Sequence, residues 1–331
     1  MDKKRKNVVV IGGGTGSAIV LKGLKKYPVA LSAIVATTDS GGSSGFIAEQ
    51  FNMVSPGDMR QCFAALAGAQ FDFLNERFRT RFLKGHTFGN LLIARYFEKT
   101  KNIQHALDAL LAQTNTDGAV LPMLLRPAAL VAHLKNGRVL RGEHAITLSR
   151  KIRTQLKSIT VSPALPKANP RAVAAIKHAD VIIIGPGNLY ASILPHFLLP
   201  EIRAAFIASP AQKIYIANLF TQPGHTDHFF VSDYLAVLAR FIGQDPFTHI
   251  LYNTAKLPSS LIKTHQNKIT GSPVRITPES KKDPRYIGRP LASTTTKPRS
   301  PSDPLSSIRN PFLHDADKLA KAIASVLSIE T

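Results

Sequence analysis

The chain has 331 residues, of which 44% are hydrophobic, so it can bury the core of an α/β fold with an appendage. Its single cysteine, Cys62, excludes an internal disulfide framework and a cysteine-based zinc site, and we expect it to be buried in a helix. The formal net charge of +21 leaves three kinds of partner: nucleic acid, an acidic membrane surface or an anionic small ligand. The apolar run at residues 8–11 is too short for a signal peptide or a membrane span, which predicts a cytoplasmic protein.

The excess of Lys and Arg lies mostly in residues 137–157 and 256–312, outside the glycine-rich segments. No motif of interleaved basic and aromatic residues accompanies these two stretches, and the chain has no tryptophan. A solvated basic face accounts for them. The pattern does not favour specific nucleic-acid recognition, because non-specific attraction to phosphates needs only positive charge.

The first half of the chain has the pattern of a doubly wound α/β unit. Short apolar runs at residues 8–11 and 31–37 predict parallel strands, and an amphipathic helix is expected at residues 17–26 between them. Helical periodicity then dominates residues 58–113, with breaks at Gly85 and Asn102.

A small β excursion is expected at about residues 120–160. Asn136 and Gly137 form a strong hairpin-turn signal. Alternation of polar and apolar residues predicts antiparallel strands at residues 128–134, 138–140 and 145–148.

The parallel pattern returns in the second half. Strands are expected at residues 181–184, 214–217 and 250–252. Helices are expected at residues 171–178, 232–243 and 315–327. The sequence thus predicts a Rossmann-like, doubly wound, mainly parallel sheet in residues 1–255. Residues 256–312 are expected to form a polar, Pro/Ser/Lys-rich segment of low complexity that is loosely packed or partly disordered. A C-terminal helix in residues 313–331 is expected to pack on the main domain.

Glycine-rich loops follow three of the predicted parallel strands. Such loops lie at the carboxyl edge of a parallel sheet, where open α/β sheets bind ligands. Their backbone N–H groups can cradle an anion, and a following helix adds its positive N-terminal end. We therefore predict a phosphate-bearing ligand bound by Gly13, Gly14, Thr15 and Gly16, by Asp39, Gly41, Gly42, Ser43 and Ser44, and by Gly185, Gly187 and Asn188.

Further candidate residues stand at helix starts and after a later strand. Asp58 either caps its helix or faces a metal ion or a substrate hydroxyl, and Arg60 can clamp a phosphate. His86 is a candidate base, phosphate contact or packing residue, and Asn90 is a cap or a ligand contact. The last candidate binding residues, after residues 214–217, are Asn218, Thr221 and Gln222.

These clusters, in this order, resemble the gluconeogenesis-factor family, the YvcK-like branch of the CofD-like or 2-phospho-L-lactate transferase superfamily. The matching stretches are residues 10–16, 39–45, 56–60, 85–90, 185–192, 221–227 and 314–319. The resemblance implies a Rossmann-like fold. It also implies a cytoplasmic regulatory factor that binds a nucleotide sugar, UDP-linked, and acts in central carbon metabolism and in the control of cell wall and cell shape.

Two other functions stay open. One is a CofD-type transferase that moves a phospholactyl group to a deazaflavin precursor with Mg²⁺, with Asp39 and Asp58 as candidate catalytic residues. The other is a basic, nucleic-acid-associated protein. Ser40 stands where the family usually has a second acid, so no metal ligand is assigned and Mg²⁺ stays open as a cofactor. We expect Arg60 and the glycine N–H groups to neutralise the phosphates without a metal; whether the chain is an enzyme, and its oligomeric state, are left open.

Overall fold

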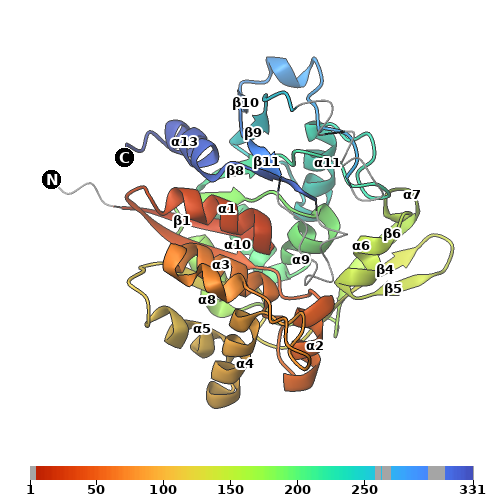
Figure 1. Ribbon diagram of the computed structural model, residues 1–331. Helices are drawn as coiled ribbons and strands as arrows, with labels where there is room; N and C mark the ends of the chain where they lie inside the picture. The colour runs from red at the N-terminus through yellow and green to blue at the C-terminus, as the bar shows by residue number, and fades with distance from the viewer. Residues whose placement is uncertain (1–4, 258–261, 263–269, 297–309, 331) are drawn as a thin grey trace.

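The computed structural model describes residues 5–257, 262, 270–296 and 310–330. Its centre is a seven-stranded sheet in which all neighbouring strands are parallel (Figure 1). The predicted doubly wound, mainly parallel sheet is therefore confirmed. In spatial order the strands are β10 (Tyr286–Arg289), β9 (His249–Asn253), β8 (Gln212–Ile216), β7 (Val181–Ile184), β1 (Lys6–Gly12), β2 (Val29–Val35) and β3 (Ala119–Pro122).

The order of the strands reverses next to β1. The chain first builds outward from β1 through β2 to β3, and later from β7 through β8 and β9 to β10 on the other side. Val10 of β1 consequently pairs with Ala33 of β2 and with Ile183 of β7. The carboxyl ends of β1 and β7 form a topological switch point, where α/β sheets of this kind bind ligands.

Helices cover both faces of the sheet. Successive side chains of β1 point to opposite faces and therefore belong to two different cores. Val8 and Val10 belong to one core and Val9 and Ile11 to the other. The first core is covered by α1 (Gly14–Leu24), α3 (Gly57–Ala67) and α13 (Ala316–Leu327). The second is covered by α8 (Pro170–Lys177), the π-helix η2 (Leu189–Ile193), α9 (Leu194–Phe197), α10 (Pro200–Ala208) and α11 (Val231–Ile242).

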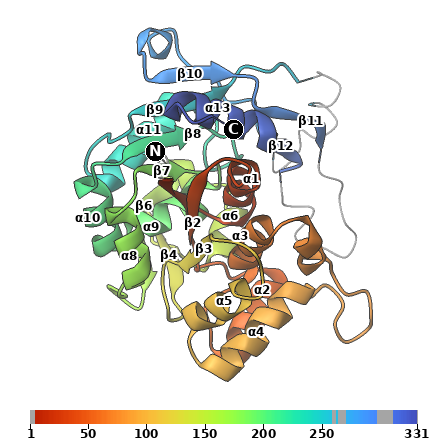
Figure 2. The same ribbon diagram turned by 90° about the vertical axis from the view of Figure 1, so that its left-hand side faces the viewer.

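A helical group lies beside the β3 edge of the sheet, in the lower part of Figure 2. It consists of α2 (Gly42–Phe51), the 3-10 helix η1 (Ala69–Asn75), α4 (Phe88–Thr100) and α5 (Ile103–Leu111). The predicted break at Asn102 is confirmed, because Asn102 Oδ1 accepts a hydrogen bond from the N–H of Gln104 at 2.9 Å and so caps α5. Cys62 is fully buried in α3, as predicted.

The expected β excursion is present, but one of its strands lies elsewhere in the sequence. The three antiparallel strands are β4 (Ala129–Leu134), β5 (Val139–Arg141) and β6 (Leu156–Ser162). Residues 145–148 were expected to be the third strand and instead belong to the helix α6 (Glu143–Leu148), which is followed by the short helix α7 (Ile152–Gln155). A hydrogen bond from Thr147 Oγ1 to Glu143 Oε1 at 2.6 Å joins successive turns of α6.

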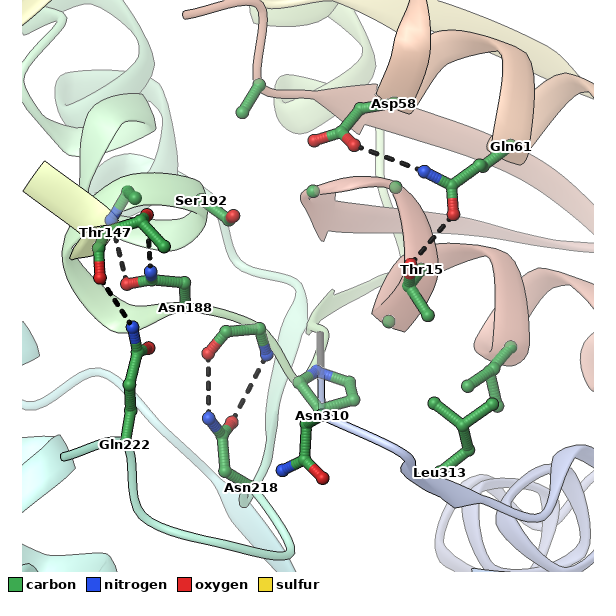
Figure 3. Close-up of a pocket in the computed structure, with 18 of the residues that line it drawn as sticks. Thr15, Asp58, Gln61, Thr147, Asn188, Ser192, Asn218, Gln222, Asn310 and Leu313 are labelled. Atoms are coloured by element: carbon green, nitrogen blue, oxygen red, sulfur yellow. Dashed lines mark hydrogen bonds between the residues drawn. The ribbon is translucent and has the colours of Figure 1, made fainter. Parts of the chain in front are cut away.

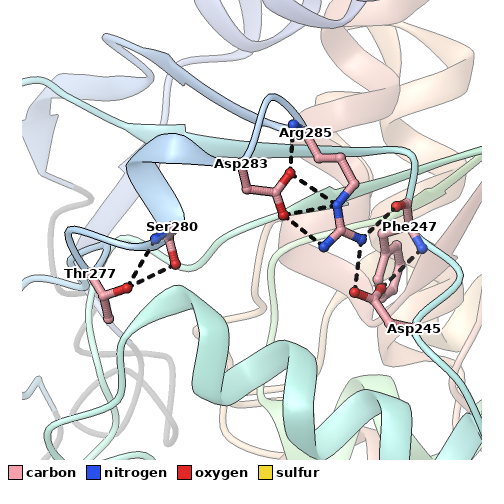
Figure 4. Close-up of polar contacts among 6 residues, drawn as sticks. All are labelled: Asp245, Phe247, Thr277, Ser280, Asp283 and Arg285. Atoms are coloured by element: carbon pink, nitrogen blue, oxygen red, sulfur yellow. Dashed lines mark hydrogen bonds and ion pairs between the residues drawn. The ribbon is translucent and has the colours of Figure 1, made fainter.

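Where it is described, the segment at residues 256–312 contains regular secondary structure. Residues 258–261, 263–269 and 297–309 lie outside the described part, so the expectation for the segment as a whole stays a prediction. The segment adds the edge strand β10 to the main sheet, and β11 (Ala292–Thr296) pairs with β12 (Phe312–His314) beyond the 3-10 helix η3 (Ser280–Lys282). Just before β10, Arg285 donates to Asp245 Oδ2 at 2.8 Å, which ties this segment to the body (Figure 4). Arg285 also donates to Asp283 Oδ2 at 2.8 Å within its own segment. Composition alone did not reveal the order of this segment, because its buried apolar residues, such as Leu291 and Ala292, stand in short runs among polar residues.

Among the described residues, no single helix is long and apolar enough to cross a membrane. One bent pair, Leu189–Phe197 with Pro200–Ala208, meets the requirement by length and composition, with a bend of 78°. Both Leu194 and Phe197 of this pair are fully buried in the core beneath the sheet.

Docking of α13 is expected to stabilise the fold. Leu319 is 0% exposed in the core under α1, so Leu319→Ala should lower the free energy of unfolding by about 2–5 kcal/mol through lost burial and a residual cavity. The exposed Lys321 provides a matched control, and Lys321→Ala should change stability by less than about 0.5 kcal/mol. Urea unfolding followed by circular dichroism measures both; equal effects would contradict the docking of α13.

Candidate functional site

The loops after β1 and β7 touch each other at the switch point. The N–H of Gly185 donates to the carbonyl of Ile11 at 3.0 Å. A Cβ on Gly16 would lie 1.7 Å from the carbonyl oxygen of Pro186, so only glycine lets α1 begin this close to the loop after β7. The two glycine loops therefore open at the same edge of the sheet, as predicted.

A cavity of about 310 Å³ lies at this edge (Figure 3). Predicted binding residues that line it are Gly13, Gly14, Thr15, Gly16, Asp39, Gly187, Asn188, Asn218, Thr221 and Gln222. The second catalytic candidate, Asp58, lines it as well. Predicted residues that are not among its lining are Gly41, Gly42, Ser43, Ser44, Arg60, His86, Asn90 and Gly185.

Asp58 lies against the backbone of the first glycine loop. A Cβ on Gly14 would be 2.5 Å from Asp58 Oδ1. Gln61 Nε2 donates to the same oxygen at 3.4 Å, and Thr15 Oγ1 donates to Gln61 Oε1 at 2.8 Å (Figure 3). Helix capping does not account for Asp58, because the N-cap of α3 is Pro56 and has no side-chain cap bond. The first turns of α1 and α3 are thus joined by side chains at the cavity.

Amide side chains fix the opposite wall. The N–H of Gly187 donates to Asn218 Oδ1 at 3.2 Å, and Asn218 Nδ2 donates back to the carbonyl of Gly187 at 2.8 Å (Figure 3). Asn188 Oδ1 caps the following π-helix, and its Nδ2 donates to Thr147 Oγ1 at 3.1 Å. Gln222 Nε2 donates to the carbonyl of Thr147 at 3.4 Å. Asn218 and Asn188 therefore hold the loop after β7 in place.

Arg60 occupies a different position from the one expected of a phosphate clamp in the cavity. Its side chain is buried, its Nε donates to Asn90 Oδ1 at 2.9 Å and its Nη1 donates to Asn75 Oδ1 at 2.5 Å. Asn90 Nδ2 donates to Ser43 Oγ at 3.4 Å, and that oxygen lies 2.9 Å from His86 Nδ1. These residues form a polar cluster at the start of α2, where they hold the second glycine loop.

Several lining residues were not among the predicted site residues. Residues 145–148 of α6 were expected to be a strand, so the side chains that α6 contributes to the cavity were not predicted. Residues 314–319 near the C-terminus match the resembled family, but none of them was predicted to contact a ligand. Phe220 and Phe312 stack with ring centroids 4.2 Å apart, and together they form an apolar part of the wall. The additional polar and aromatic lining residues are Gln61, Glu143, His144, Thr147, Ser192, Phe220, Asn310, Phe312 and His314.

The lining is acidic although the chain is strongly basic. Asp39, Asp58 and Glu143 line the cavity, and none of the described lining residues is Lys or Arg. Asp39 Oδ1 accepts a hydrogen bond from the N–H of Gly41 at 2.9 Å, and Ser55 Oγ donates to Asp39 Oδ2 at 3.3 Å. In the described part of the chain, no group of three or more His, Cys, Asp or Glu side chains could hold a metal ion by itself.

Three histidines are held neutral by burial. Desolvation lowers the pKa of His314, which lines the cavity, from 6.5 to about 4. Desolvation likewise lowers the pKa of His196 and that of His225 to about 4. His225 is 0% exposed, and the centroid of its ring lies 6.0 Å from that of Tyr190. It is therefore a core residue of the loop that carries Gln222.

The fold and the cavity define a Rossmann-like α/β protein with a polar pocket at the switch point of a parallel sheet. The model of the family described as 2-phospho-L-lactate transferase CofD matches residues 8–287. The chain belongs to this family.

Its relatives are named gluconeogenesis factors. The gluconeogenesis factor of Listeria innocua is 40% identical over 267 residues, which cover 79% of this chain and 82% of that protein. The one from Bacillus subtilis is 35% identical over 268 residues, which cover 80% and 83%. A crystal structure from Bacillus halodurans, described as a member of the UPF0052 family, has a TM-score of 0.84 and 31% identity, and the match covers 97% of this chain and 99% of that chain.

The contact between the two glycine loops can be tested with a pair of variants. Gly16→Ala should lower the free energy of unfolding by about 1–3 kcal/mol, because its Cβ would overlap the Pro186 carbonyl and force the loops apart. Gly187→Ala should be nearly neutral, since its Cβ would lie 3.6 Å from Ile193, an ordinary contact. Urea midpoints of both variants decide this. A neutral or stabilising Gly16→Ala would contradict the close contact between the loops, because alanine otherwise favours a helix over glycine.

Burial of His314 predicts loss of stability in acid. The folded-state pKa of about 4 lies below the ordinary 6.5, so the unfolded chain binds the proton first and stability falls as the pH drops through this range. His314→Gln should reduce that slope by at most about 1.4 kcal/mol per pH unit, whereas the exposed His133→Gln should leave it unchanged. Urea unfolding at several pH values measures the slopes, and identical slopes in all three proteins would contradict the neutral state of His314.

Proposed function

We propose that the chain is a cytoplasmic regulatory factor that binds a nucleotide sugar, UDP-linked, in the cavity at the switch point. The observation that supports this most directly is the meeting of two glycine loops at one sheet edge, so close that a Cβ on Gly16 would lie 1.7 Å from the carbonyl oxygen of Pro186. Diphosphates bind well at such places, because backbone N–H groups and a helix N-terminus converge there. A cavity of about 310 Å³ is at the small end of the range that ligand pockets occupy.

The diphosphate in this proposal lies against Gly13–Gly16 at the start of α1. Gly13 is the N-cap of α1 and has no side chain with which to cap the first-turn N–H groups. An anion can therefore satisfy these donors, as phosphates do at other helix N-termini. The sugar and the base then extend toward Thr147 and Gln222 on one side and the stacked pair of Phe220 and Phe312 on the other.

The acidic lining changes the expectation about metal ions. Arg60 was expected to neutralise the phosphates, but its guanidinium bonds to Asn75 and Asn90 outside the lining. A diphosphate beside Asp39 and Asp58 needs a positive counter-charge. Mg²⁺ fits this donor set, because it is commonly held by one or two carboxylates together with substrate phosphates. When bound, it would supply charge neutralisation, while Gln61 and Thr15 hold the carboxylate of Asp58 in place.

The regulatory role rests on the relatives. Proteins 35–40% identical to this chain are named gluconeogenesis factors, which supports a role in central carbon metabolism. A link to cell-wall and cell-shape control follows from the same resemblance, because nucleotide sugars are precursors of cell-wall polymers.

A CofD-type transferase is the second candidate. It is favoured by the match of the CofD family model to residues 8–287 and by the position of Asp39 and Asp58 in one cavity. In that case, the acceptor hydroxyl would attack a phosphoryl group and catalysis would be mostly positioning and charge neutralisation. Multiple turnovers with a deazaflavin acceptor would replace the regulatory proposal with this one.

Calorimetric titration with UDP-glucose as the probe tests the proposal. We expect saturable binding that weakens by about tenfold or more when Mg²⁺ is removed by a chelator, the scale of one charge-assisted interaction. Asp58→Asn should remove much of the Mg²⁺ dependence, whereas Asp72→Asn, an exposed acid outside the lining, should bind like the wild type. No binding of UDP-glucose or of other UDP-hexoses by folded protein would overturn the proposal.

A further inference from the structure

The segment between η1 and α4 forms a loop with an exposed apolar tip. The side chains of residues 79–84 are all exposed, and Phe82 is 93% exposed. Leu83 beside it is 38% exposed. In Figure 2 this orange segment projects from the lower right of the molecule, away from the central sheet. A fully exposed phenylalanine at the tip of a projecting loop is costly in water and points to a partner surface.

Basic side chains surround this tip. Arg79 and Arg81 precede Phe82, and Lys84 follows Leu83. Within the described ranges none of these three cations takes part in an ion pair. Residues 77–84 thus interleave basic and aromatic side chains, a pattern that the basic stretches 137–157 and 256–312 lack. The loop therefore combines an apolar tip with three flanking cations that form no ion pair among the described residues.

Hydrogen bonds hold the base of the loop, so the tip has a defined position on the surface. The N–H of Phe78 donates to the carbonyl of His86 at 2.9 Å, and the N–H of Gly85 donates to the carbonyl of Phe78 at 3.1 Å. Arg77 Nη1 donates to the carbonyl of Gly85 at 2.5 Å. The ring of Phe78 lies 6.3 Å from that of Phe88, which is itself 41% exposed and extends the apolar surface.

We propose that this loop docks the protein on a membrane surface that contains anionic lipids, with Phe82 and Leu83 inserted at the level of the headgroups and Arg79, Arg81 and Lys84 facing lipid phosphates. Aromatic and aliphatic side chains partition into this interface, and each nearby cation adds attraction to an anionic leaflet. The inference is independent of the ligand in the cavity, because none of these residues lines it.

Charge and shape favour this occupant over two others. A second copy of the chain would bring another net charge of +21 to the same basic surface, so self-association through the loop is electrostatically opposed. Single-stranded nucleic acid would use the cations and Phe82, but it stacks its bases on aromatic rings, and Leu83 at the tip offers no such ring. A bilayer interface uses both apolar side chains and all three cations.

Vesicle co-sedimentation of the full chain tests the proposal. The probe is a vesicle of equal parts phosphatidylglycerol and phosphatidylcholine, compared with one of phosphatidylcholine alone. The wild type should bind the anionic vesicles and be released by salt. Phe82→Ser should weaken binding by about fivefold or more, and Arg79→Glu with Arg81→Glu by more than about tenfold, since each cation near such a surface contributes about a factor of five.

Matched controls separate docking through the loop from general attraction of a basic protein. Leu165→Ser changes an apolar side chain that is 79% exposed elsewhere, and it should bind like the wild type. Arg138→Glu with Arg141→Glu makes the same change of charge on the exposed β4–β5 hairpin and should weaken binding less than the loop pair does. Equal losses in the two charge pairs, no effect of Phe82→Ser, or binding of the loop to a single-stranded oligonucleotide but not to vesicles would each overturn the proposal.

Discussion

The close approach of α1 to the loop after β7 is the contact on which the rest of the site depends. At Gly16 there is no room for even one more carbon atom, because the carbonyl oxygen of Pro186 occupies the position that a Cβ would need. This contact brings the N-terminus of α1 to the switch point between β1 and β7. It also places the backbone donors of one strand end beside those of the other, which no side chain could do as compactly.

Polar side chains around this contact hydrogen-bond mainly to other groups of the protein. Asn218 and Asn188 bond to the backbone of the loop after β7, and Arg60 bonds to Asn75 and Asn90 near the start of α2. Buried polar groups of this kind are satisfied internally because an unpaired donor or acceptor in the interior is costly. Among the described residues, the charged side chains that line the cavity are, in contrast, the carboxylates of Asp39, Asp58 and Glu143. That division explains how a chain with an excess of Lys and Arg can have an acidic cavity.

The sequence was sufficient for five strands of the main sheet, β1, β2, β7, β8 and β9, and for the edge at which their loops open. Uninterrupted apolar runs such as residues 181–184 have few alternative structures, and glycine loops mark the carboxyl ends of three of these runs. It was not sufficient for α6, whose short alternating pattern fits a strand as well as a helix turn. It also could not place Arg60, because a motif gives a residue's position in the chain but not the neighbours that bond to it. Nor did it predict β3 or β10. The strand β10 pairs with β9 at the edge of the sheet, and Arg285 just before it bonds to Asp245, 40 residues away.

The C-terminal part of the chain completes the site and ties it to the stability of the fold. α13 packs so closely on α1 that a Cβ on Gly23 would lie 2.2 Å from the carbonyl oxygen of Ala316. Just before α13, Phe312 stacks on Phe220, and the N–H of Asp315 donates to the carbonyl of Leu291 at 2.8 Å. One helix, α1, therefore carries the glycine loop at its N-terminus and receives the end of the chain along its side. The same end of the chain supplies one wall of the cavity, because Phe312 and His314 line it, so the packing of α13 on α1 also positions that wall.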